Sequence, residues 1–205
     1  ISNQACRALL CYLVDFGPAA TPERAINVAL GFGSTEYGFL ATMAFTLPFT
    51  VASLAAGVLA DRGNRMLINA CSGMAWSMST ICMAAASSYE VLLVQRGLLG
   101  TAQAATNPAS LSLLADLFPE SRATTSAIFG LGIYLGAGLA SLGAAVDQRM
   151  GWRTCCLAYG VTSLLVSALA LLGSDDRGRQ PRSTSAPRRR ARSSAVPEGG
   201  PTGPL

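Results

Sequence analysis

The chain contains no histidine and no lysine, and only 13% of its 205 residues are charged. Without histidine, histidine-dependent catalytic triads, histidine-containing zinc sites and haem ligation by imidazole are excluded. The sequence also lacks a Gly-x-Ser-x-Gly element and a cluster of carboxylates. Its six cysteines lie in or beside apolar segments without the spacing of metal ligands, so we expect packing thiols. We therefore expect no enzyme, no cofactor and no metal site.

The scarcity of charge goes with a high apolar content. Hydrophobic residues make up 51% of the chain and the mean hydropathy is +0.41, whereas an average soluble domain is about 25% charged. Residues 37–60 and 66–86 carry no ionisable acid and no arginine. Each run can cross a hydrocarbon layer of about 30 Å as a helix. A soluble helical protein would need a polar face on such helices, so the sequence favours an all-α, multi-pass integral membrane protein.

We expect six transmembrane helices, at about residues 4–30, 37–60, 66–86, 90–115, 124–146 and 154–172. The first is the weakest, because it is interrupted by Arg7, Asp15, Pro18, Pro22, Glu23 and Arg24. Either only residues 8–20 are buried, or a broken helix continues to Leu30. Broken helices at membrane depth are tolerated where they line a cavity.

The composition changes abruptly after Leu172. Residues 173–205 are rich in Arg, Ser, Pro and Gly and cannot build a core, so we expect a six-helix bundle over 1–172 and a disordered basic tail over 173–205. The tail is either a solvated linker or a polybasic segment that touches anionic lipid. Nucleic-acid binding is not expected, because the arginine cluster at 188–192 lacks aromatic residues for stacking.

Arginine counting predicts the orientation. If the N-terminus is cytoplasmic, ten arginines fall on the inner side, namely Arg62, Arg65, Arg122 and seven in the tail. The outer side then carries only Arg24, Arg149 and Arg153. The positive-inside rule therefore places the N-terminus and the tail in the cytoplasm.

The stretch from Gly57 to Arg65, Gly-Val-Leu-Ala-Asp-Arg-Gly-Asn-Arg, is a charged hinge between two long apolar runs. One interpretation is an ordinary loop whose arginines set topology. The other is a conformational gate, in which Gly57 permits close helix approach while Asp61 meets a helix N-terminus or a cation on a neighbouring helix. Arg62 and Arg65 would belong to the same gate.

Arg96 is the strongest candidate for a binding residue. It lies about 6 residues into its span, so it is roughly 9 Å deep at 1.5 Å per residue. Placing arginine in the membrane costs about 2.5 to 3.5 kcal/mol on insertion scales. Such a charge either faces the bundle interior and pairs with an acid or an anionic substrate, or snorkels to the outer headgroups.

Asp15 is the natural partner for Arg96 if the first helix begins near Gln4. A nearby arginine lowers the proton affinity of a carboxylate, so movement of the arginine would switch a proton carrier. The alternative is a structural role for Asp15, as a helix cap after a break at the interface.

Proline and glycine mark expected kinks and close helix contacts. Asn107-Pro108 and Pro48 are expected to kink their helices, because proline removes a hydrogen bond and clashes with the preceding turn. Gly100, and Gly132 and Gly136 in the glycine-rich fifth span, are expected at close helix contacts.

Several of these stretches resemble the major facilitator superfamily. Gly57-x-x-x-Asp61-Arg62-x-x-Arg65 resembles its loop signature between the second and third helices. The run from Arg96 to Gly100 and the fifth-span glycines are similar to its fourth and fifth helices. The hinge, the loop from Asp116 to Pro119 with Arg122, and Tyr12 before Asp15 look most similar to spinster-like transporters.

The resemblance implies one six-helix half of a twelve-helix secondary transporter that moves a small organic or lipid-like solute by alternating access. It also assigns a proton-linked pair to Asp15 and Arg96. The expected partners are the lipid bilayer, the solute and a C-terminal transporter half in the full-length chain. The alternative is a half-transporter that acts as an interaction module or is an inactive fragment, and Ile1 in place of an initiator methionine favours a fragment.

Overall fold

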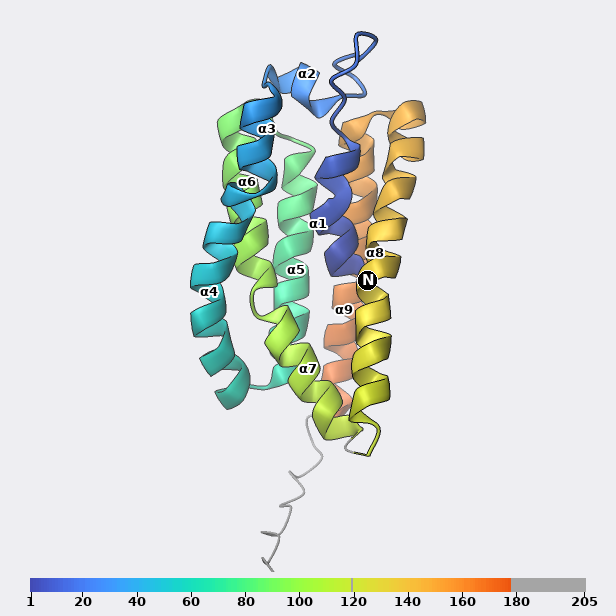
Figure 1. Ribbon diagram of the computed structural model, residues 1–205. Coiled ribbons are helices and arrows are strands. Elements are labelled where there is room, and N and C mark those ends of the chain that lie inside the picture. Colours follow the sequence, from blue (N-terminus) through green and yellow to red (C-terminus); the bar gives the residue numbers. More distant parts are fainter. Residues whose placement is uncertain (119, 178–205) are drawn as a thin grey trace, which may run out of the picture.

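The computed structural model describes residues 1–118 and 120–177, and this part of the chain forms an elongated helical bundle without strands (Figure 1). The helices are α1 (Ser2–Tyr12), α2 (Ile26–Leu30), α3 (Ser34–Ala41), α4 (Met43–Arg62), α5 (Arg65–Met83), α6 (Tyr89–Gln103), α7 (Thr106–Leu117), α8 (Arg122–Met150) and α9 (Trp152–Arg177). The all-α prediction is therefore confirmed over the described residues.

The first expected span is not a continuous helix. α1 ends at Tyr12, and a connection over residues 13–25 leads to the short α2. Gly17, Pro18 and Pro22 explain the break, because glycine weakens a helix and each proline removes a backbone donor. The connection is fixed by a main-chain bond of 2.9 Å from the Ile26 nitrogen to the Leu13 oxygen. Of the two expected alternatives, the structure agrees with the broken helix that reaches Leu30, because α2 ends at that residue.

The second and fourth expected spans are each divided into two helices. α3 and α4 are separated at Thr42, and Pro48 lies inside α4. α6 and α7 are separated at Ala104 and Ala105, just before Pro108 in the first turn of α7. Pro108 has no N–H for the Ala104 carbonyl, which accounts for a break at this point.

The last helix extends beyond the predicted end of the bundle. α9 continues past Leu172 to Arg177, where the sequence analysis expected disorder from residue 173. No proline occurs between Trp152 and Arg177 to stop the helix. The rest of the expected basic tail, residues 178–205, lies outside the described residues.

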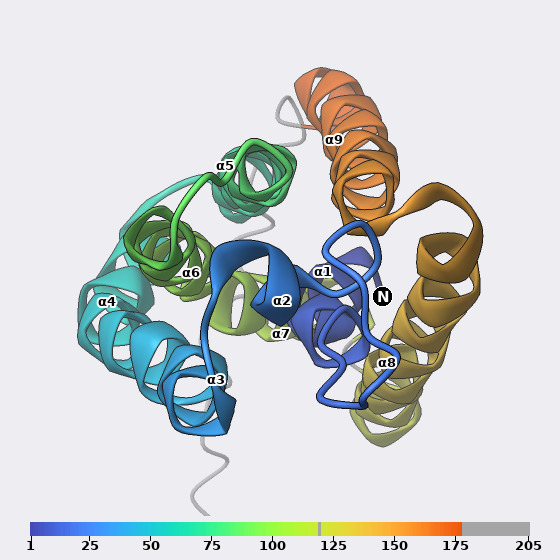
Figure 2. The same cartoon turned by 90° about the horizontal axis from the view of Figure 1, so that it is seen from above.

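The helices pack side by side with extensive contacts between α5 and α9, between α4 and α6, and between α1 and α8 (Figure 2). A cluster of fully buried side chains joins the connection after α1 to the start of α9 and includes Leu9, Leu13, Ile26, Leu40 and Trp152. All six cysteines are free, as predicted.

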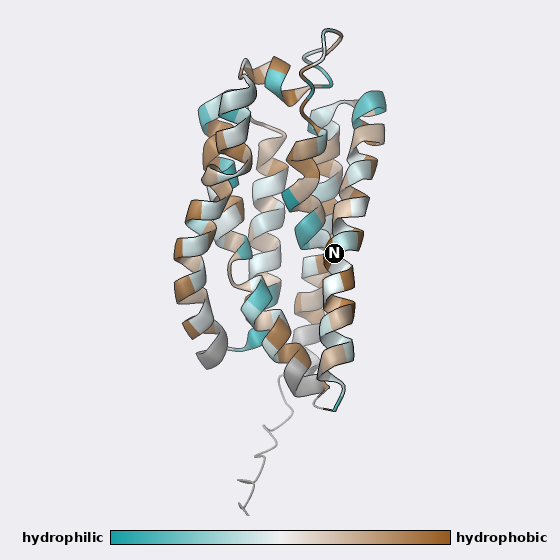
Figure 3. Ribbon diagram, viewed as in Figure 1, coloured by the Kyte–Doolittle hydropathy of each residue, from teal (hydrophilic) through white to brown (hydrophobic). Residues whose placement is uncertain are grey.

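Apolar residues recur along the helices of the bundle (Figure 3). Large side chains are exposed on several helices, with 76% of Leu54, 77% of Tyr134 and 72% of Leu172 accessible. Three segments of the described chain are long and apolar enough to cross a membrane: Ser34–Leu59, Ala123–Met150 and Trp152–Leu172. They coincide with the second, fifth and sixth expected spans.

Candidate functional site

Arg96 lies inside the bundle and not at its surface. It is the eighth residue of α6, about 10 Å along the helix axis from Tyr89 at 1.5 Å per residue. Only 2% of Arg96 is exposed. Its Nη1 donates a hydrogen bond of 3.2 Å to the main-chain oxygen of Arg7 on α1, and its Nε has no hydrogen-bond partner among the described residues. The guanidinium therefore faces the interior.

The groups that interact electrostatically with Arg96 come from three other elements. They are Arg7 and Cys11 of α1, Tyr37 of α3 and Cys156 of α9. None of these partners is a carboxylate. Because an arginine side chain stays charged in proteins, Arg96 is a buried cation without an acidic partner in this part of the molecule.

Arg7 is a site residue that the sequence analysis missed. Its side chain is exposed, and its Cζ lies 4.4 Å from the centroid of the Phe45 ring on α4. A guanidinium over an aromatic face gains a cation–π attraction of about 0.5 to 2 kcal/mol. Since the Arg7 main chain also accepts the bond from Arg96, two cations belong to one part of the bundle. The sequence signal was a second arginine, near the start of an apolar run.

Asp15 is not brought to Arg96. It is exposed and follows the end of α1, in the connection over residues 13–25. Its Oδ1 accepts a 2.8 Å bond from the Gly17 nitrogen. Its main-chain nitrogen donates to Asn27 Oδ1 at 3.0 Å, and its main-chain oxygen accepts from Asn27 Nδ2 at 2.8 Å. Asp15 therefore does not occupy the mid-helix position that the sequence analysis expected.

The charged hinge lies at the opposite end of the bundle from α2 (Figure 1). Asn64 caps α5, since its Oδ1 accepts from the nitrogens of Met66 at 3.1 Å and Leu67 at 3.3 Å. Arg65 donates from Nη1 to the Ser112 oxygen of α7 at 3.5 Å. The space beside Gly57 is open, so no close helix approach occurs there within the described residues. The side chains of Asp61 and Arg62 lie outside them.

Two of the singled-out glycines lie at close helix contacts. A Cβ on Gly100 would come within 2.5 Å of the Phe45 main-chain oxygen, so α4 and α6 approach here through their backbones. A Cβ on Gly136 of α8 would collide with the main-chain oxygen of Ile1, and a Cβ on Gly132 would lie 3.5 Å from the Ile1 side chain. These contacts hold the start of α1 against α8.

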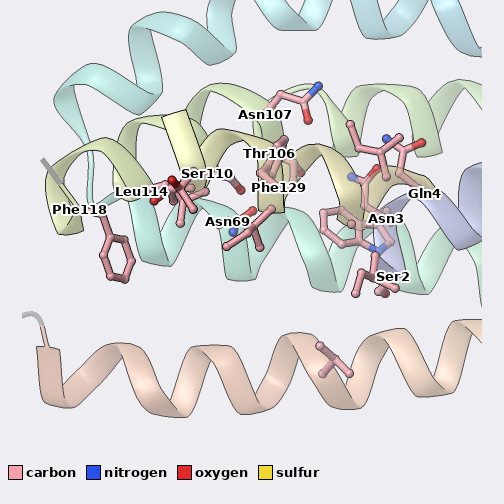
Figure 4. A pocket seen from close by; sticks show the side chains of 18 of the residues that line it. Ser2, Asn3, Gln4, Asn69, Thr106, Asn107, Ser110, Leu114, Phe118 and Phe129 are labelled. Carbon is pink, nitrogen blue, oxygen red and sulfur yellow. The ribbon is translucent and has the colours of Figure 1, made fainter. Parts of the chain in front are cut away.

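A cavity of about 740 Å³ lies beside the start of α1 and is also lined by α5, α7 and α8 (Figure 4). Its polar lining comes from α1, α5, α7 and α8 and includes Ser2, Asn3, Asn69, Thr106 and Thr125. Within the described chain, Asn69 Oδ1 and Thr106 Oγ1 are buried without a hydrogen-bond partner. The cavity thus has a mostly apolar wall with several polar side chains.

The family model described as Major Facilitator Superfamily matches residues 6–200. The chain belongs to the major facilitator superfamily. Its sequence is 30% identical over 122 residues to the sphingosine-1-phosphate transporter SPNS2 of Danio rerio. This match covers 58% of this chain and 24% of that protein. It is also 30% identical over 154 residues to protein spinster homolog 1 of Homo sapiens. That match covers 70% of this chain and 29% of the relative.

The fold agrees with this membership of the superfamily. A bacterial homologue of the human lysosomal transporter Spinster, solved in an inward-facing and occupied conformation, superposes with a TM-score of 0.70 at 22% identity. The match covers 83% of this chain and 41% of the bacterial protein. The chain is spinster-like, and it spans about a quarter of the length of the curated relatives.

Proposed function

We propose that this chain forms the N-terminal half of a secondary transporter that moves a small organic or lipid-like solute by alternating access. The observation that carries the proposal is Arg96, a cation that is 2% exposed inside an apolar bundle and has no acidic partner among its interacting groups. An ionisable residue inside a membrane bundle is costly and marks a pathway or a binding site. Membership of the superfamily supplies the transport class.

The bundle would cross the membrane six times. α1 would make the first crossing, α3 with α4 the second, α5 the third, α6 with α7 the fourth, α8 the fifth and α9 the sixth. The hinge, the turn from α7 to α8 and the end of α9 share one end of the bundle in Figure 1. Arginine counting makes this end cytoplasmic in our proposal.

The solute would carry an anionic group. The two guanidinium groups of Arg7 and Arg96 belong to one region and lack an acid among their described contacts. Guanidinium groups recognise phosphate and carboxylate through paired hydrogen bonds. The relative from Danio rerio is named for sphingosine-1-phosphate, a lipid with a phosphate headgroup. We therefore propose a single-chain amphiphile with an anionic head.

The hinge would act as the conformational gate at the cytoplasmic end. The bond from Arg65 to the Ser112 oxygen connects the start of α5 with α7, so a helix movement there must alter this contact. Asp61→Asn should change the balance between inward-open and outward-open states. Cysteine accessibility from the two sides would measure that balance, and an unchanged pattern would leave the hinge with only its topological role.

Proton coupling is part of the proposal, and Asp15 stays a candidate carrier. Its exposed position makes it a carboxylate of the outer connection. In proteoliposomes, Asp15→Asn should then lose uptake driven by a pH gradient and keep solute exchange at equal pH. Retained gradient-driven uptake would remove Asp15 from the coupling mechanism.

The substrate class is tested with the full-length protein in proteoliposomes. Dodecyl phosphate, dodecanoate, dodecanol and dodecyltrimethylammonium differ in head charge and share a chain length. Uptake of the two anions in preference to the neutral and cationic compounds is expected. Equal uptake of all four, or preference for the cation, would refute an anionic solute.

A further inference from the structure

The structure contains a buried carboxyl group that the proposed transport site does not use. Asp147 lies one helical turn before Met150, the last residue of α8, and only 7% of it is exposed. Its Oδ1 is buried without a hydrogen-bond partner among the described residues. Asp147 is therefore an unpartnered acid inside the outer half of the bundle, whereas Asp15 is exposed.

Two physical effects act against a negative charge at this position. A buried carboxylate without hydrogen bonds loses its hydration and gains nothing in exchange, so such groups neutralise or find a partner. The C-terminal end of a helix also carries partial negative charge from its unpaired carbonyls, which disfavours an anion in the last turn. The neutral carboxylic acid avoids both costs.

One neighbouring cation acts in the other direction. The groups that interact electrostatically with Asp147 are Arg24 in the connection after α1 and the thiols of Cys155 and Cys156 on α9. Uncharged thiols do not compensate a carboxylate, so Arg24 is the only compensating group among these three. Because Arg24 is exposed, a small movement of the connection changes its influence on Asp147.

The connection is attached to the bundle beside Asp147. Trp152 donates from Nε1 to the Pro22 oxygen at 3.2 Å and from its main-chain nitrogen to the Glu23 oxygen at 3.3 Å. Gly151 has a φ of +81° and lies so close to the Glu23 oxygen that a Cβ would be 2.8 Å from it. A pocket of about 610 Å³, lined in part by Arg24 and Trp152, opens at this end. Water can thus reach the helix end within one turn of Asp147.

We propose that Asp147 is a proton-binding residue of the transporter. In the arrangement seen here burial favours its neutral form at mildly acidic pH, and during the transport cycle it releases its proton to water in the outer pocket and pairs with Arg24 as a carboxylate. Reprotonation from the same pocket breaks the pair. The proton is the ligand of this site, and its uptake and release couple the outer connection to α8. This inference rests on the proposed transport function.

The protonation of Asp147 is tested by infrared spectroscopy on the full-length protein in nanodiscs, without any transport assay. The difference spectrum between wild type and Asp147→Asn isolates the C=O stretch of one protonated carboxyl group. A band present at mildly acidic pH, lost at alkaline pH and retained in Asp15→Asn is expected. Arg24→Gln should keep the band to higher pH, because it removes the compensating cation. Absence of the band in wild type, or its persistence in Asp147→Asn, overturns the proposal.

Coupling is tested by the same variants in proteoliposomes with dodecyl phosphate as solute. Asp147→Asn should lose most of the dependence of the uptake rate on the outer pH, about tenfold or more, while solute exchange at constant outer pH continues. A dependence on the outer pH equal to that of wild type would overturn the coupling role even where the infrared band is seen. If wild type transports none of the solutes but shows the band, the proposed function fails and the proton site stands.

Discussion

The buried guanidinium of Arg96 on α6 is hydrogen-bonded to the main chain of Arg7 on α1, with 3.2 Å between Nη1 and the carbonyl oxygen. The acceptor is a backbone atom, so the contact does not depend on the Arg7 side chain. That side chain lies instead against the Phe45 ring and is exposed. A substitution of Arg7 therefore tests its charge independently of Arg96. It removes the Arg7 guanidinium and leaves the hydrogen bond of Arg96 intact.

Arg7→Gln should weaken solute binding without disturbing the bundle. A hydrogen bond to a charged group contributes about 1.5 to 3 kcal/mol, which corresponds to a rise of about 10-fold to 100-fold in the KM for dodecyl phosphate. The concentration dependence of uptake measures this change. Arg7→Lys keeps the charge and should recover part of the affinity. A KM for Arg7→Gln equal to that of wild type would place Arg7 outside the solute site.

Gly100→Ala should destabilise the contact between α4 and α6. The new Cβ would come within 2.5 Å of the Phe45 oxygen, so one helix must move, and overpacking of this kind costs about 1 to 3 kcal/mol. Thermal unfolding in detergent measures the loss. Gly97→Ala on the same helix is the matched control, because the nearest atom would be 3.6 Å away. Equal melting temperatures for the two variants would contradict this packing.

Trp76→Phe should lower stability through a lost hydrogen bond and the void that the smaller ring leaves. Trp76 Nε1 donates to Ser163 Oγ at 2.9 Å, and both residues are buried. The Ser163 hydroxyl keeps its contact with Ser2 Oγ, so the lost bond itself costs about 0.5 to 1.5 kcal/mol. A double-mutant cycle with Ser163→Ala should show coupling between the two positions in thermal unfolding. Strictly additive effects would mean that this bond does not contribute to stability.

Asn27→Ala should loosen the connection over residues 13–25. The Asn27 side chain pairs with both main-chain groups of Asp15, and both bonds are lost in the variant. Protease cleavage within the connection should become faster by about tenfold, the factor that 1.4 kcal/mol of lost local stability gives. Thr21→Ala, at an exposed position in the same connection, is the control. Equal cleavage of the two variants would show that other contacts hold the connection.

The helices could be predicted where a segment is both long enough to cross a membrane and free of charge. Charge-free runs identify α4 and α5, because few other structures accommodate such segments. The course of the chain after Tyr12 was harder to predict. Whether Gly17, Pro18 and Pro22 bend a helix or end it depends on contacts such as the pairing of Asn27 with Asp15, which joins residues far apart in sequence.

Only part of the candidate site could be predicted from the sequence. Arg96 stands out in the sequence because an arginine so far into an apolar run is costly, and the structure places it inside. Arg7 and Asp147 were missed, because each lies near the end of an apolar segment where a charge is usually solvated. Only the packing of α1 and α8 shows that Arg7 lies over an aromatic ring and that Asp147 is buried.

The central claim is that the buried cation of α6 serves solute transport, and the initial rate of dodecyl phosphate uptake tests it most directly. Full-length Arg96→Ala is compared in proteoliposomes with Arg149→Ala, which removes an exposed arginine from the end of α8. Both proteins are first matched for helix content and melting temperature. We expect Arg149→Ala to transport at the wild-type rate and Arg96→Ala to fall below about one tenth of it, as the loss of a charge-assisted contact predicts. Uptake at the wild-type rate by well-folded Arg96→Ala would contradict the account.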